Sequence, residues 1–162
     1  MKIISQHLEK WLAWLLVVLM IAIVVDVTWQ VVSRFLLGDP SSYTEELARF
    51  LLMWIGLLGA AYAYRRHSHL SLDLLLMNSS VEKQVLLLRV IHCVSFLFAA
   101  SAMVYGGVQL MTLTLSLEQT SAALGVPMGY VYSCIPLSGI LICWFAAENF
   151  LHPDPGTISH HE

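Results

Sequence analysis

Three polar side chains recur at four-residue intervals within an otherwise apolar stretch near the N-terminus: Asp26, Gln30 and Arg34. At this spacing they share one face of a helix. Asp26 and Arg34 would lie about 12 Å apart along the helix axis, so only Gln30 could connect them. This polar stripe could relay protons or ions, or it could pack against another helix or protein. We favour the second interpretation, because a relay needs acidic groups on facing helices and the middle parts of the later apolar stretches contain none.

A second charged group, Glu45, Glu46 and Arg49, stands at the start of the next apolar stretch. Glu45 and Arg49 form an i, i+4 pair with the acid first, which is the order that stabilises a helix. An exposed pair of this kind contributes less than about 1 kcal/mol. The group is therefore either a helix start with a surface ion pair or a contact with a partner protein or lipid headgroups, and both interpretations stay open.

Patterns for catalysis or for a bound cofactor are weak or absent. His67, His69 and Asp73 lie close together, but a metal site needs more ligands at fixed spacing. His92 is the only histidine inside a predicted membrane span, so a haem would lack a second, facing histidine. The signatures Gly-x-Ser-x-Gly and His-Glu-x-x-His and a phosphate-binding glycine loop do not occur. The sequence thus predicts neither an enzyme nor metal or cofactor binding.

Composition indicates which elements must position these residues. The chain has 162 residues, of which 58% are hydrophobic and 12% are charged, and its mean hydropathy is +0.74. A soluble domain of this size cannot bury so much apolar surface. The net charge of -3, without a basic stripe, gives no electrostatic basis for nucleic-acid binding. The composition therefore predicts a small integral membrane protein.

Four apolar stretches are long enough to cross about 30 Å of hydrocarbon as helices. The prediction is a single all-α membrane domain over residues 1–162. Its spans cover residues 11–37, 46–64, 85–117 and 128–151. Within the second span, Gly56 and Ala60 form a small-residue step that lets another helix approach closely, either from this chain or from a partner.

Lysine and arginine predict the orientation, because they concentrate in cytoplasmic connectors. The N-terminal segment and the second connector hold most of these residues: Lys2, Lys10, Arg65, Arg66 and Lys83. The first connector holds none, and none follows Arg89. We therefore expect both termini and the second connector in the cytoplasm, and the first and third connectors on the other side.

An ordered set of short motifs resembles the small membrane subunit (DctQ type) of tripartite ATP-independent periplasmic transporters, the TRAP transporters. The resemblance extends from about residue 5 to residue 150. Its motifs are Ser33-Arg34-Phe35, Tyr43-Thr44-Glu45-Glu46-Leu47-Ala48-Arg49-Phe50, Trp54, Gly59-Ala60-Ala61, His69 with Asp73, Leu124-Gly125-Val126-Pro127-Met128, Tyr132 and Pro136-Leu137-Ser138-Gly139.

The resemblance implies a role in the bacterial inner membrane. In this family a periplasmic binding protein captures an organic acid, and a large permease subunit carries the substrate and sodium sites. The small subunit packs on the large subunit, steadies its scaffold and offers surface to the binding protein. A C4-dicarboxylate is the default substrate, and sialic acid is the main alternative. No cofactor is implied.

The resemblance also implies site residues. An interface with the large subunit or its bound lipid is expected at Arg34, Glu45, Glu46, Arg49, Trp54, Gly56 and Ala60. Docking of the binding protein is expected at polar residues of the two non-cytoplasmic connectors: Asp39, Ser41, Ser42, Glu118, Gln119 and Thr120. A competing hypothesis is a self-sufficient, proton-coupled exporter that uses Asp26. A third is a cofactor-bearing anchor of a redox enzyme, which the placement of the histidines disfavours.

Overall fold

The computed structural model describes residues 2–37, 42–66 and 81–151. Four helices in this part of the chain are long and apolar enough to cross a membrane: Ile4–Phe35, Ser42–Arg65, Leu86–Ser116 and Met128–Leu151. The prediction of an all-α protein with four spans is confirmed. The side of the membrane on which the termini lie stays a prediction.

The first span is α1 (Lys2–Val32), which continues into a π-helical turn, Ser33–Leu37. The second span is α2 (Ser42–Arg65). The helix α1 starts well before the predicted boundary at residue 11. Its first turns, which precede the predicted apolar stretch, are fixed by polar contacts with other helices. Trp144 Nε1 donates a hydrogen bond to Ser5 Oγ at 3.0 Å, and Glu9 pairs with two arginines.

The third span is one long rod of three segments: α4 (Val81–Phe98), the π-helical segment η2 (Ala99–Tyr105) and α5 (Gly106–Ser116). The fourth consists of the short α6 (Met128–Tyr132) and of α7 (Cys134–Leu151). The break between them follows from Pro136, which has no N–H to donate to the carbonyl oxygen of Tyr132 four residues earlier, and whose ring crowds that carbonyl.

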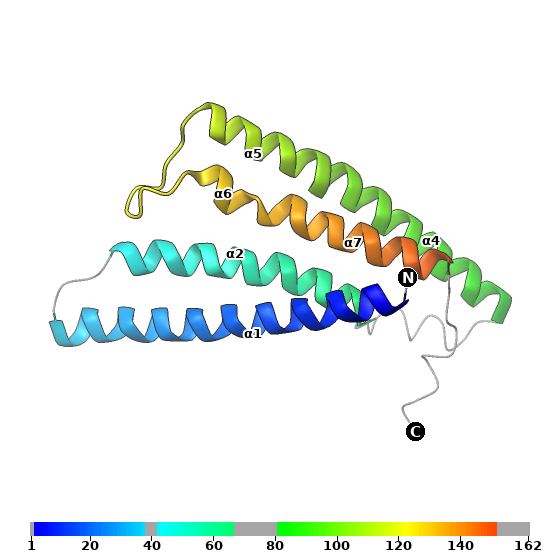
Figure 1. Ribbon diagram of the computed structural model, residues 1–162, viewed down its shortest axis with the longest axis horizontal. Coiled ribbons are helices and arrows are strands. Elements are labelled where there is room, and N and C mark those ends of the chain that lie inside the picture. The colour runs from blue at the N-terminus through cyan, green and yellow to red at the C-terminus, as the bar shows by residue number, and fades with distance from the viewer. Residues whose placement is uncertain (1, 38–41, 67–80, 152–162) are drawn as a thin grey trace, which may run out of the picture.

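The helix α7 is the centre of the molecule. It packs against α2 on one side and against α4 and η2 on the other, while α1 lies against α2 at the outside (Figure 1). In the apolar window of the fourth span 39% of the residues are buried, compared with 6% in the first span. Of the four spans, the fourth is therefore the most buried within the chain and the first is the least buried.

The buried core lies toward one end of the bundle and joins three helices. It consists of residues from α1, α2 and α7: Leu12, Leu58, Ala61, Tyr64, Phe145 and Ala146. The start of α1, the end of α2 and the end of α7 gather at this end (Figure 1). The link between α5 and α6 lies at the opposite end, beside the start of α2 (Figure 1).

Candidate interaction site

The link between α5 and α6, residues 117–127, is a tightly folded loop, which we call the connector loop. It reverses direction with positive φ angles of 49° at Glu118 and 65° at Gly125. Backbone hydrogen bonds close it from Ser121 N–H to Val126 O at 2.9 Å and from Met128 N–H to Gln119 O at 2.8 Å. The loop therefore has one defined backbone conformation without belonging to a helix.

One carboxylate from α2 fastens the connector loop. Glu46 Oε2 accepts hydrogen bonds from Ser121 Oγ at 3.0 Å and from the N–H groups of Ala123 and Leu124 at 2.9 Å each. Glu46 Oε1 accepts a further bond from the Ala122 N–H at 3.1 Å. Hydrogen bonds to an ionised acceptor are stronger than neutral ones. We call this arrangement the Glu46 latch.

The two neighbouring charges of the same helix turn behave differently. Arg49 Nη2 donates to Glu45 Oε1, and the two side chains are 72% and 58% exposed. The sequence group Glu45, Glu46 and Arg49 is thus split: one acid is used within the chain, and one ion pair faces outward. Contact of any of the three with a large subunit or lipid stays a prediction.

The four predicted docking residues that the structure describes lie at the connector end. Glu118, Gln119 and Thr120 are exposed on the connector loop, and Ser42 is the exposed first residue of α2. Leu117, Val126 and Tyr130 add exposed apolar surface: these three flank the polar residues in the chain. Asp39 and Ser41 fall outside the described residues. Their role and that of the described residues in docking remain predictions.

The polar stripe of α1 is not a connected relay. Asp26 is only 8% exposed, and its Oδ2 has no hydrogen-bond partner among the residues that the structure describes. Gln30 is partly exposed, and Arg34, in the π-helical turn, is exposed. The stripe therefore runs from a buried position at Asp26 to the surface at Arg34.

Two predicted interface residues of α2 have open space in front of them, and one does not. Gly56 and Ala60 are exposed, and a Cβ added at Gly56 would meet no atom within 4 Å. Trp54 instead packs against the buried core. The small-residue step thus faces away from the described helices of this chain.

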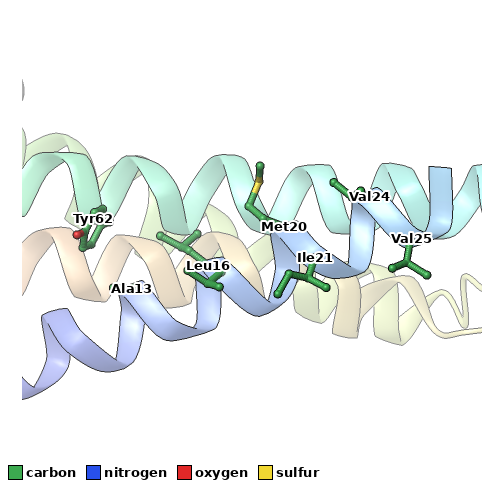
Figure 2. Close-up of a pocket in the computed structure, with 8 residues that line it drawn as sticks. Ala13, Leu16, Met20, Ile21, Val24, Val25 and Tyr62 are labelled. Atoms are coloured by element: carbon green, nitrogen blue, oxygen red, sulfur yellow. The ribbon is translucent and has the colours of Figure 1, made fainter. Parts of the chain in front are cut away.

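The surface of α1 carries an apolar groove of about 510 Å³. Figure 2 shows its lining side chains along α1, with Tyr62 of α2 at one end. Its α1 residues are Ala13, Leu16, Val17, Met20, Ile21, Val24 and Val25. The Tyr62 hydroxyl is the one polar side-chain group among the lining residues, so the groove suits an apolar helix or lipid chain better than a charged substrate.

Sequence reasoning missed an ion-pair cluster at the opposite end. Arg65 lies 3.5 Å from Glu9 and 3.6 Å from Glu148, and Arg66 lies 3.0 Å from Glu9. We call Glu9, Arg65, Arg66 and Glu148 the ion-pair cluster. In the sequence, Arg65 and Arg66 serve only as signals of orientation. The expected topology puts the start of the first span and the ends of the second and fourth spans on one side of the membrane, but it does not indicate that these arginines pair with Glu9 and Glu148.

His92 takes part in a hydrogen bond between two helices. Its Nδ1 lies 2.8 Å from the Tyr64 hydroxyl oxygen, a buried hydrogen bond that ties α2 to α4. Among the described residues no three His, Cys, Asp or Glu side chains are grouped so that they could hold a metal ion. His67, His69 and Asp73 lie outside the described residues.

Comparison with known proteins identifies the family. Residues 23–155 match the family described as "Tripartite ATP-independent periplasmic transporters, DctQ component". The sialic acid TRAP transporter small permease protein SiaQ of Vibrio cholerae is 30% identical over 134 residues, which cover 83% of this chain and 76% of that protein. The C4-dicarboxylate TRAP transporter small permease protein DctQ of Rhodobacter capsulatus is 26% identical over 121 residues, 74% of this chain and 53% of that protein.

A third relative shows the same segment inside a longer chain. The isethionate TRAP transporter permease protein DctMQ of Oleidesulfovibrio alaskensis is 30% identical over 125 residues, 74% of this chain but only 20% of that protein. The small subunit is therefore a partner of a larger permease. The chain belongs to the DctQ family: it is the small permease subunit of a TRAP transporter, a multi-pass protein of the bacterial inner membrane and not an enzyme.

Proposed function

We propose that this chain is the scaffold and docking subunit of a sodium-coupled TRAP transporter for an organic acid. In this role it packs on the large permease, steadies it, and helps to form the surface that receives the periplasmic binding protein. The observation that carries the proposal is the unfinished packing around α1, where only 6% of the apolar window is buried. A helix that is this open within its own chain calls for a protein or lipid partner in the membrane.

The interface with the large permease or its lipid lies, in this proposal, on the surface of α1 and on the open face of α2. Arg34, Glu45, Arg49, Gly56 and Ala60 are exposed there and can reach a partner directly. Glu46 and Trp54 contact residues of this chain itself. In this proposal they support the interface indirectly, by packing the helix that carries it.

The docking surface is the connector end, and we infer that this end faces the periplasm. Arg65 and Arg66 lie at the opposite end, which the distribution of basic residues assigns to the cytoplasm. Glu118, Gln119, Thr120 and Ser42 would then be available to a soluble binding protein. Asp39 and Ser41 belong to the same proposal by their place in the sequence.

The substrate class follows from the relatives. Their names specify sialic acid, isethionate and C4-dicarboxylate, all of which are organic acids. The described pockets of this chain are lined almost wholly by apolar side chains. We therefore place selection of the acid, and coupling to sodium, in the partner proteins.

Uptake by proteoliposomes tests the proposal. We expect a radiolabelled organic acid to accumulate under a sodium gradient only when this chain, its large permease and its binding protein are all present. This chain alone should transport nothing, with or without a proton gradient. Proton-driven transport by this chain alone that Asp26→Asn abolishes would contradict the proposal and establish the exporter alternative.

A further inference from the structure

The connector loop depends on one side chain from outside it. Glu46 supplies an acceptor to three consecutive backbone N–H groups, Ala122 to Leu124, and to the Ser121 hydroxyl. Successive N–H groups that converge on one point form an anion-binding concavity. Here the anion belongs to the chain itself, 75 residues earlier in the sequence than Ser121.

We propose that Glu46 is the positioning residue of the docking surface: it holds the connector loop in the conformation that the binding protein recognises, without touching the binding protein. The inference rests on the proposed docking function. It also explains how the surface keeps its shape. The loop's own hydrogen bonds close its ends, and the latch fixes its middle on α2.

The outer side of the loop fits a soluble protein partner. Glu118, Gln119 and Thr120 are exposed beside the exposed apolar side chains of Leu117 and Val126. A charged and polar edge around a small apolar area is typical of protein interfaces. A loop that is ordered before binding loses less conformational entropy on binding, so the latch should strengthen docking.

Glu45 provides a matched control. It precedes Glu46 in the same helix turn and carries the same charge, but its partner is the exposed Arg49. Glu45→Gln therefore removes one negative charge from the same region without touching the connector loop. Because Glu45 also lies on the proposed interface with the large permease, the two variants are compared in complexes that recover the large permease equally. In such complexes, any difference between Glu46→Gln and Glu45→Gln reports on the latch and not on the overall charge of the surface.

The experiment uses the complete membrane complex in lipid nanodiscs. Two quantities are measured: the affinity for the purified binding protein, and the amide hydrogen exchange of residues 118–127. For Glu46→Gln we expect faster exchange at 122–124 and an affinity about tenfold weaker, because bonds to an ionised acceptor are about twice as strong as neutral ones. Ser121→Ala, which removes one donor and keeps the acid, should show a smaller change of the same kind.

Each outcome either supports or overturns the proposal. Equal affinity for the wild type and Glu46→Gln overturns the latch proposal alone, whether or not exchange increases, provided that the wild-type complex binds. An equal loss for Glu45→Gln overturns it in favour of a general charge effect. If the wild-type complex does not bind its binding protein, the docking function fails and the latch proposal fails with it. Equal recovery of the variants with the large permease shows that the complex still assembles.

Discussion

Arg65 joins three helices at the ion-pair end. From the last turn of α2 it faces Glu9 of α1 and Glu148 of α7, and its guanidinium lies 5.6 Å from the centre of the Phe145 ring. Glu148 is only 3% exposed, and its Oε2 has no hydrogen bond among the described residues. The positive charge of Arg65 is therefore what makes the buried Glu148 carboxylate tolerable.

This arrangement predicts a large loss of stability for Arg65→Met. The variant leaves Glu148 buried beside no compensating charge, which should cost about 3–5 kcal/mol. Arg49→Gln removes an equally charged residue from an exposed pair and should cost less than about 1 kcal/mol. Thermal unfolding in detergent micelles measures both. Similar shifts of the unfolding midpoint for the two variants would contradict the account.

Interactions within one helix were easier to predict from the sequence than interactions between distant segments. The Glu45–Arg49 pair was predictable because both partners lie on one helix at a fixed spacing. The sequence places Glu46 in a charged group at a helix start and Arg65 among the signals of orientation, but it does not indicate their partners. Those of Glu46 lie on the connector loop, and those of Arg65 lie on α1 and α7. Only the packing of α2 against α7, and the return of the connector loop to α2, brings those partners within reach.

At the scale of elements, two glycines mark different helix surfaces: one is packed against another helix of this chain, and the other is open. A Cβ added at Gly139 of α7 would lie 2.7 Å from Met103 Cβ and 3.1 Å from the Val104 backbone nitrogen of η2. A Cβ added at Gly56 of α2 would meet no atom within 4 Å. The close approach of α7 to η2 thus requires a glycine, whereas the step at Gly56 is unused within the chain.

The same substitution should therefore have opposite effects at the two sites. Gly139→Ala forces α7 and η2 apart and should destabilise the chain by about 1–3 kcal/mol. Gly56→Ala should leave stability unchanged or raise it by up to about 1 kcal/mol, since alanine favours the helix. Unfolding midpoints of the isolated chain provide the measurement. A destabilising Gly56→Ala would show that this face is packed within the chain.

The number and type of the elements were predictable, and the predicted third and fourth spans, 85–117 and 128–151, agree with Leu86–Ser116 and Met128–Leu151 to within one residue. The start of α1 and the break inside the fourth span were not predictable. Long apolar runs indicated four spans, because a membrane helix needs about 20 such residues. Hydropathy measures only the part inside the membrane, so it missed the first turns of α1, where Ser5 and Glu9 make polar contacts. It also missed the break before Cys134, which depends on the hydrogen bond that Pro136 cannot donate to Tyr132 and not on polarity.

At the scale of the whole molecule, the two ends are built differently. Charged side chains tie α1, α2 and α7 together at one end, and a single carboxylate fastens the connector loop at the other. Between them, the fourth span is the most buried of the four and the first span is the least buried, with 39% and 6% of their apolar windows buried. Figure 1 shows α1 at the outside of the bundle, where its uncovered apolar surface is available to a partner or to lipid.

The central claim is that this chain works as one part of a membrane complex. Affinity purification of the tagged chain from native membranes in mild detergent, with identification of the proteins that accompany it, tests this claim most directly. The account predicts a large multi-span permease in stoichiometric amount. A chain that is recovered alone, or together with a redox enzyme and a visible pigment, would contradict it.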